Sequence, residues 1–285
     1  MEEGKVLVLG ATGTVGRPLV RALLAKGVAV KAASRAGAAV EGAEGVVFDH
    51  ADPATFEAAF EGVDRVYMLL PAGRLDVVGE LGAVIAAAQA RGAKVVMQSV
   101  FGADADDAIP YRQIELALGR SGLAHVILRP NWFADNFVTY WKWQIDQGRI
   151  SVPAAAGKVS FVDVRDIADS AAAALASDRF DGKAFNLTGP AAVGYAEAAA
   201  LIAEAIGRPV AYEPVDDAAL VADLTGVGVA RDYAEFLAAI FYPVREGWAA
   251  AVTGDVETLT GHAPRSLQTW VRDNAAALGA TAVPA

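Results

Sequence analysis

The chain has 285 residues, of which 54% are hydrophobic and 20% charged, and this balance supports a large folded core and excludes a disordered chain. The net charge of −10 disfavours nucleic acid as a partner, because a polyanion would be repelled. The sequence contains no cysteine, which excludes disulfides, thiolate catalysis and cysteine-ligated metals.

The first predicted element is a short apolar strand over residues 6–9, which leads directly into a glycine-rich turn and a helix. In a dinucleotide-binding turn, one glycine permits the tight turn, a second lets a diphosphate approach the backbone, and a third lets the helix pack closely. The amides at the start of the helix then face the phosphates. We predict that this turn binds a dinucleotide through Gly10, Thr12, Gly13, Thr14, Val15 and Gly16. The alternative is a strand–helix turn without a ligand.

Strands and helices alternate over the rest of the first 130 residues. Apolar runs predict strands over 28–33, 45–48, 65–70, 94–99 and 124–129. Helical patterns lie between most of them, over 18–26, 53–60, 75–91 and 109–120. Near-continuous apolar strands separated by helices predict a parallel sheet covered on both faces. The predicted fold class is α/β, a Rossmann-type doubly wound parallel sheet, with residues 1–130 as the NADP-binding Rossmann domain.

The pattern becomes less regular after Arg129. We expect short strands over 159–162, 184–187 and 210–214, and helices over 163–176, 195–206, 216–224, 229–244 and 265–277. An aromatic-rich segment, residues 137–143, has helical spacing and favours a core or interface role over a substrate wall. Residues 131–285 are therefore predicted to form mainly a smaller C-terminal α/β substrate lobe, with parts that return to the sheet.

The end of the second strand indicates the cofactor. An acidic residue there would bind a ribose 2′-hydroxyl, whereas the sequence has Ser34 and Arg35 and no carboxylate. The guanidinium fork of Arg35 suits a 2′-phosphate, which predicts NADP(H) over NAD; the alternative is a solvated loop cation. Asp49, at the end of the third strand, is placed to receive the adenine amino group. The alternative role for Asp49 is the cap of the next helix, which Asp52 before a proline fits better.

Ligands of an open α/β sheet bind beyond the carboxyl ends of its strands, which directs attention to the segments that follow them. For cofactor contacts at these ends we predict Leu70, Pro71 and Ser99, and for the substrate Phe101, Asn131, Trp132 and Phe133. Ser99 is also a candidate hydrogen-bonding group for the reacting atoms, although such a serine more often caps a strand. Tyr111, at the start of the next helix, is the second catalytic candidate.

Several runs of the sequence resemble the NmrA-like atypical short-chain dehydrogenase/reductase family. Within that family the chain is similar to NADPH quinone reductases, triphenylmethane reductase and ergot-alkaloid-type iminium reductases. The resemblance implies a Rossmann fold, an NADP(H) cofactor and oxidoreductase activity, and it covers nearly the whole chain. The matching runs are residues 10–16, Ser34-Arg35, residues 128–133, residues 161–168 and residues 264–267.

The chain departs from ordinary short-chain dehydrogenases at the catalytic tyrosine. Those enzymes use Tyr-x-x-x-Lys, in which the lysine lowers the pKa of the tyrosine, whereas this chain has Tyr111-x-x-x-Glu115. A carboxylate raises the pKa of a neighbouring phenol, which makes Tyr111 a poor general base but leaves it a hydrogen-bond donor. This disfavours alcohol oxidation. It favours hydride delivery to an acceptor that is already electrophilic, of the quinone, iminium or imine, or enone type.

Two other functions remain open from the sequence. One is a non-catalytic, NADP-binding redox-sensing regulator, and the other is a non-redox biosynthetic isomerase or cyclase. The three histidines, His50, His125 and His262, have no metal-ligand spacing, so no metal site is predicted; His50 could lie near the adenine. No secretory signal or membrane-spanning run is visible. We expect a cytoplasmic monomer or homodimer whose partner is a small-molecule substrate, with no membrane or nucleic-acid partner.

Overall fold

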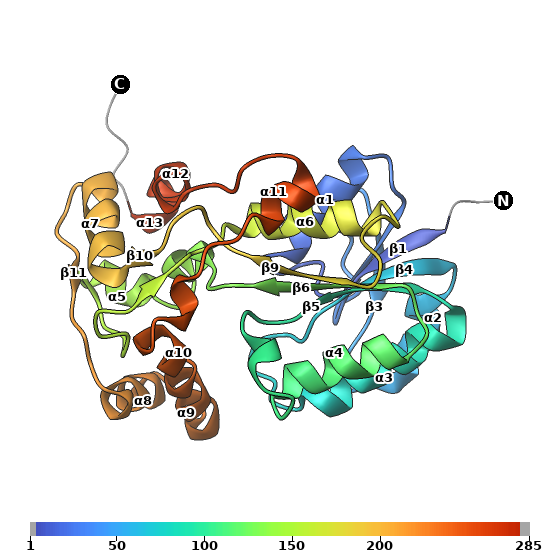
Figure 1. The fold of residues 1–285 in the computed structure, drawn as a ribbon, viewed down its shortest axis with the longest axis horizontal. Coiled ribbons are helices and arrows are strands. Elements are labelled where there is room, and N and C mark those ends of the chain that lie inside the picture. The colour runs from blue at the N-terminus through green and yellow to red at the C-terminus, as the bar shows by residue number, and fades with distance from the viewer. Residues whose placement is uncertain (1–3, 280–285) are drawn as a thin grey trace. The chain divides into compact units, whose positions relative to one another are not determined.

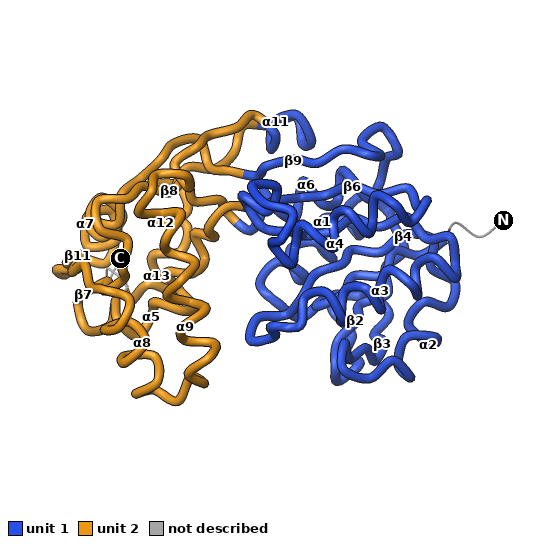
Figure 2. Tube along the Cα trace, turned by 60° about the horizontal axis from the view of Figure 1, so that its bottom comes forward, with its two compact units in different colours: residues 1–130, 164–187, 255–262 blue, residues 131–163, 188–254, 263–285 orange. Residues whose placement is uncertain are grey.

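The computed structural model describes residues 4–279 and divides the chain into two compact units. Unit 1 comprises residues 1–130, 164–187 and 255–262, and unit 2 comprises residues 131–163, 188–254 and 263–285 (Figure 2). Each unit therefore contains segments that are distant in the sequence, and unit 1 receives two segments from the second half of the chain.

Unit 1 is built on a seven-stranded parallel sheet with the strand order β3-β2-β1-β4-β5-β6-β9 (Figure 1). The strands are β1 (Lys5–Val8), β2 (Val30–Ser34), β3 (Glu44–Val47), β4 (Val63–Met68), β5 (Lys94–Gln98), β6 (His125–Pro130) and β9 (Lys183–Leu187). Most residues of β1, β2, β4, β5 and β6 are buried, as expected for a parallel sheet covered on both faces. This confirms the doubly wound Rossmann-type fold.

Helices cover both faces of this sheet (Figure 1). One face carries α1 (Gly16–Ala25) and α6 (Val164–Leu175), with α11 (Asp255–Thr260) packed against α6 and β9. The other carries α2 (Phe56–Phe60), α3 (Val77–Arg91) and α4 (Pro110–Arg120), whose apolar side chains join the core beneath the strands. Short 3-10 helices precede α2 and α4, at Pro53–Thr55 and Ala103–Ala105.

Unit 2 has its own core, in which aromatic rings are prominent. Phe137, Trp141, Phe161, Tyr195 and Trp270 are each less than a tenth exposed and lie within one cluster. The helices of this unit are α5 (Lys142–Asp146), α7 (Tyr195–Ile206), α8 (Asp217–Gly226), α9 (Arg231–Ala239), α10 (Tyr242–Arg245), α12 (Leu267–Asp273) and α13 (Ala275–Leu278). Its strands form two small two-stranded sheets, β10 (Val193–Gly194) with β8 (Lys158–Val159), and β11 (Ala211–Tyr212) with β7 (Arg149–Ile150); 3-10 helices span Ala134–Val138 and Trp248–Ala250.

Two segments that were each predicted as one continuous helix are each divided into two helices, so these predictions are wrong. The helix expected over 229–244 is two helices, α9 and α10, because Pro243 lacks an amide hydrogen and its ring would meet the carbonyl of Ala239, the residue at which α9 ends. The helix expected over 265–277 is likewise divided at Asn274, whose side-chain amide donates to the carbonyl oxygen of Trp270 at 2.9 Å. Helix α11 and the short strands β7 and β10 were not predicted.

The structure also bears on membrane association. Among residues 4–279 there is no helix of sufficient length and apolarity to cross a lipid bilayer.

Candidate active site

The strand order places the glycine-rich turn at the point where the sheet changes direction. Strand β1 lies between β2 and β4, and the chain runs outward from it on both sides. Because all these strands are parallel, their carboxyl ends lie at one edge, where α/β proteins bind their ligands. Gly10 follows β1 at this edge, and the side chain of Leu69, just after β4, lies 3.4 Å from where a Gly10 Cβ would be.

The turn after β1 requires its glycines for reasons that the structure makes explicit. Gly10 has a φ of +65°, a left-handed conformation that glycine adopts without strain. The amide of Gly13 donates to the carbonyl oxygen of Gly10 at 2.9 Å, which closes the turn. A Cβ on Gly16 would overlap that same carbonyl oxygen and would lie 2.7 Å from the Cα of Ala11. The start of α1 can approach β1 this closely only because position 16 is a glycine.

The N-terminus of α1 is open to an anion. No side chain caps it at Val15, and its first turn contains no acidic residue. Thr12, Gly13 and Thr14 are exposed, so the backbone of the turn is accessible. Unpaired amides and the positive end of the helix dipole favour a phosphate group here. This geometry fits the diphosphate of a dinucleotide at the predicted residues.

At the end of β2, the side chain of Ser34 is engaged in a hydrogen bond, whereas the side chain of Arg35 is exposed. The hydroxyl of Ser34 accepts the amide hydrogen of Ala38 at 3.1 Å, so it shapes the loop that follows. Arg35 is exposed, and within residues 4–279 it has no hydrogen-bond or ion-pair partner. On α1, the Nε of Arg17 donates to the carbonyl oxygen of Thr12 at 3.0 Å. An unpaired guanidinium next to the phosphate-binding turn fits the 2′-phosphate of NADP(H).

Beyond β3, the structure separates the roles of two aspartates. Asp52 caps the following 3-10 helix by accepting the amide of Ala54, as expected, whereas Asp49 accepts the amide of Ala51 at 3.0 Å. Between them His50 is buried, and neither ring nitrogen has a hydrogen-bond partner in the part of the chain that the structure describes. Burial lowers the pKa of His50 and holds the ring neutral. Unsatisfied polar atoms in this position suit a heteroaromatic base such as adenine.

At the other side of β1, the carboxyl end of β5 leads into a buried ionic network. The hydroxyl of Ser99 donates to Oε1 of Glu115 at 2.6 Å. Arg129 donates two hydrogen bonds to the same carboxylate, from Nε at 2.8 Å and from Nη2 at 2.7 Å, and its Nη1 donates to Asp104. Arg112 adds a fourth donor to Glu115 at 3.2 Å. Ser99, Glu115 and Arg129 are each at least nine-tenths buried.

The electrostatics of Glu115 follow from this network. Burial raises the pKa of its carboxyl, but hydrogen bonds from Arg129 and Ser99 outweigh burial and bring the pKa below its ordinary value. Glu115 is therefore an ionised acceptor, and the proton of Ser99 points at it. The spacing from Tyr111 singles out this glutamate in the sequence but does not indicate its partner, Arg129. An arginine ending an apolar strand, and a glutamate between apolar Ile114 and Leu118 on α4, were the available signals.

Tyr111 lies near the start of α4, is half-buried, and packs against the core of unit 1. Leu70 is buried and Pro71 half-buried where the chain leaves β4, and Phe101 is half-buried in the connection between β5 and α4. The amide of Phe101 donates to the carbonyl oxygen of Pro130 at 3.1 Å, which continues the pairing of β5 with β6. The predicted residues of unit 1 thus gather at the carboxyl edge of its sheet.

The predicted substrate residues that follow β6 belong to unit 2. Asn131 is buried, and its amide group donates to Ser160 and to the carbonyl oxygen of Ala249 and accepts from the backbone of Trp132. All of its hydrogen-bonding atoms are therefore engaged in holding the loop. Trp132 stacks on Trp141 with ring centroids 5.9 Å apart, and both Trp132 and Phe133 remain partly exposed.

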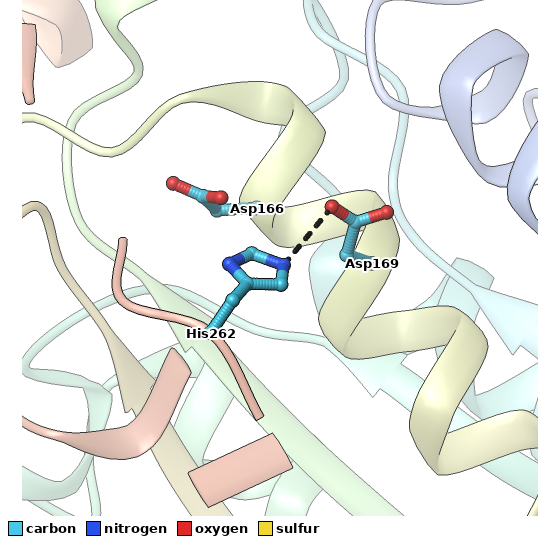
Figure 3. Close-up of side chains that lie close together, drawn as sticks. All are labelled: Asp166, Asp169 and His262. Carbon is cyan, nitrogen blue, oxygen red and sulfur yellow. Dashed lines mark ion pairs between the residues drawn. The ribbon is translucent and has the colours of Figure 1, made fainter. Parts of the chain in front are cut away.

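A separate cluster of titratable side chains lies on α6. Asp166 and Asp169 are one helical turn apart, and His262 reaches them from the segment after α11 (Figure 3). The Nε2 of His262 lies 3.4 Å from Oδ2 of Asp169, and one ligand-type atom from each residue falls within 4.8 Å of the others. Among the described residues this is the one cluster with metal-ligand chemistry. The contact between His262 and Asp169, which ties this segment to α6, accounts for the cluster, and we propose no metal.

The chain is similar in sequence to proteins that bind a nicotinamide dinucleotide. A family model described as NAD(P)H-binding matches residues 10–178, the span from the glycine-rich turn past α6. The chain belongs to this NAD(P)H-binding family. The oxidoreductase YesF of Bacillus subtilis is 33% identical over 97% of each chain. The NAD(P)H azoreductase of Xenophilus azovorans is 32% identical, with 96% of this chain and 99% of that protein covered.

Solved structures agree on the fold. The NADPH-dependent quinone oxidoreductase QOR2 of Escherichia coli, in complex with NADPH, superposes with a TM-score of 0.83. It is 24% identical in sequence, and the match covers 94% of this chain and 99% of that one. The family assignment confirms the predicted nicotinamide cofactor. The open N-terminus of α1 fits the diphosphate of this cofactor. Arg35 and His50, whose polar atoms have no partner among residues 4–279, fit its ribose phosphate and its base.

Proposed function

We propose that this protein is an NADPH-dependent reductase that delivers hydride to an electron-poor small molecule. The acceptor is of the quinone, iminium or imine, or enone type. Similarity to an azoreductase and to a quinone oxidoreductase supports this assignment, because both relatives are named for reduction of conjugated acceptors. The preference for NADPH is supported by Arg35, which lies unpaired at the end of β2, where a carboxylate would favour NADH.

The hydrogen bond between Ser99 and Glu115 supports this choice of substrate class. Four residues after Tyr111, where ordinary short-chain dehydrogenases have an ammonium group, this chain has a buried carboxylate held by Arg129. The hydroxyl proton of Ser99 is directed at that carboxylate and is not available to a developing alkoxide. Without the ammonium group and the Ser99 hydroxyl, Tyr111 is the one catalytic candidate left to donate, and this gives little stabilisation to the reduction of a simple ketone.

The chain's own residues then supply binding and orientation. When bound, NADPH supplies the hydride. The amides of the turn and α1 hold the diphosphate, and Arg35 holds the 2′-phosphate, which together set the position of the nicotinamide end. An acceptor whose reduced product is neutral or resonance-stabilised needs no proton from the protein in the same step. Quinones, iminium ions and enones satisfy this condition.

NADPH oxidation against a panel of acceptors tests the proposal. The panel contains a para-quinone, a cationic iminium compound, a cyclic enone and a simple ketone, each assayed with NADPH and with NADH. We expect turnover with at least one conjugated acceptor, none with the ketone, and higher kcat/KM with NADPH. Arg35→Glu should remove the preference for NADPH, while Arg120→Glu, an exposed cation at the far end of α4, should retain it. Tight NADPH binding without any turnover would instead indicate the redox-sensing regulator.

A further inference from the structure

The Glu115 network consists of Ser99, Asp104, Glu115 and Arg129. It links strand β5, the connection between β5 and α4, helix α4 and strand β6. Ser99 directly follows β5, Asp104 lies in the 3-10 helix within the connection, Glu115 is on α4, and Arg129 is near the end of β6. Arg129 alone bonds to both Glu115 and Asp104, so it links α4 to the 3-10 helix. The connection, residues 99–109, is thus tied to the network at its start by the buried Ser99 and in its middle by the half-exposed Asp104.

The energetics indicate that this network serves geometry more than stability. A buried ion pair gives up hydration of both charges, and well-packed apolar residues of similar size often stabilise a fold equally well or better. What the ion pair adds is direction, since the two parallel bonds between a guanidinium and a carboxylate fix their relative orientation. Here the fork of Arg129 fixes the Glu115 carboxylate, which in turn fixes the Ser99 hydroxyl.

Besides backbone hydrogen bonds such as that from Phe101 to Pro130, and the ion pair between Asp107 and Arg112, the connection has few buried contacts to hold it. Residues 104–108 are all exposed, and only Ala103 is buried between Ser99 and Ile114. Exposed segments with few buried contacts open locally at low cost in free energy. The same connection carries Phe101 and leads to Tyr111, two residues of the predicted site.

We propose that Glu115 is a positioning residue that, through Arg129 and Ser99, holds the connection 99–109 in the conformation used for reduction. This inference rests on the proposed function for its effect on turnover. It assigns to Glu115 a role different from that of the lysine found at this place in ordinary short-chain dehydrogenases. The carboxylate acts on the backbone next to the substrate and not on the reacting atoms.

The test removes the ion pair without leaving a buried charge. In Glu115→Leu/Arg129→Met both partners become apolar residues of similar size, and such a replacement of a buried ion pair often leaves the fold stable. Asp104→Asn is a milder variant, because Asp104 is half-exposed and its loss frees only the 3-10 helix. Lys94→Met is the matched control: Lys94 is buried at the opposite end of β5, where its Nζ lies 2.5 Å from Asp181.

Two readouts separate positioning from general stability. We expect hydrogen–deuterium exchange of residues 99–109 to be faster in the double variant and in Asp104→Asn, and unchanged in Lys94→Met. We expect the double variant to lose about 10-fold to 100-fold in kcat with a much smaller change in its NADPH Kd. Of the predicted cofactor residues only Ser99 belongs to the network, and the phosphate-binding turn lies beyond β4 from it. Lys94→Met should lower Tm and leave kcat at the wild-type value.

Several results would overturn the inference. Unchanged exchange over 99–109 in both variants would show that the network does not hold the connection. A wild-type kcat in the double variant, or an equal loss in Lys94→Met, would show that the network is merely structural. Failure of wild-type protein to reduce any acceptor would count against the proposed function alone, and the exchange experiment would still decide whether Glu115 holds the connection.

Discussion

Replacing Gly16 by alanine should destabilise the protein, although alanine is normally the better residue in a helix. The added Cβ would overlap the Gly10 carbonyl oxygen and lie 2.7 Å from the Ala11 Cα, about 1 Å closer than ordinary carbon–carbon contact. Both neighbours are backbone atoms, so no side-chain rotation relieves the overlap. Forcing the turn and α1 apart costs about 2–3 kcal/mol, and the helix preference of alanine returns up to about 1 kcal/mol.

The net loss of about 1–2 kcal/mol corresponds to a fall of about 2–4 °C in Tm for a chain of this size. Gly82→Ala is the matched control, because Gly82 is inside α3 and a Cβ there meets nothing within 4 Å. It should gain about 0.5–1 kcal/mol. Thermal and urea unfolding measure both changes, and fluorescence titration should show weaker NADPH binding by Gly16→Ala. A Gly16→Ala protein as stable as wild type, beside a stabilised Gly82→Ala, would refute the close approach of α1 to β1.

Other predictions follow from strain, burial and charge. Ala155 has a φ of +47°, so Ala155→Gly should stabilise the protein by about 1 kcal/mol in urea unfolding, whereas Ala156→Gly should not. Because burial lowers the pKa of His50, the unfolded state binds the proton first; stability should decline as pH falls below about 6.5, and His50→Phe should flatten that decline between pH 7.5 and 5. Arg129→Met alone leaves the buried Glu115 carboxylate without its main partner and should cost about 3–5 kcal/mol; a loss below about 1 kcal/mol would contradict the ion pair.

Local signals in the sequence were sufficient to predict the sheet of unit 1. Each apolar run became a strand within a few residues of the expected limits, because a buried parallel strand must be apolar on both faces. Gly62 and Gly92, shortly before β4 and β5, have φ values of +69° and +63°, which other residues rarely adopt. The glycine-rich turn needed only its spacing and its place between a strand and a helix.

The partners of buried polar side chains were not predictable in this way. Glu115 lies 14 residues before Arg129 and 16 after Ser99, and only the packing of α4 against β5 and β6 brings them together. Asn131 had the same difficulty, since its amide bonds to Ala249, 118 residues away in the sequence. Pro243 is a different case. Its effect on helix continuity is local, and it should have divided the predicted helix.

The return of α6, β9 and α11 to unit 1 has a consequence for how this protein is made. A ribosome releases residues from the N-terminus onward, so when residue 130 emerges β6 is still an open sheet edge. That edge is covered only when β9 has been synthesised and its residues 183–187 pair with β6. Nascent chains arrested between residues 130 and 183 would therefore carry an unpaired strand and a half-covered sheet, and a shortened gene encoding residues 1–130 would yield a protein prone to aggregate.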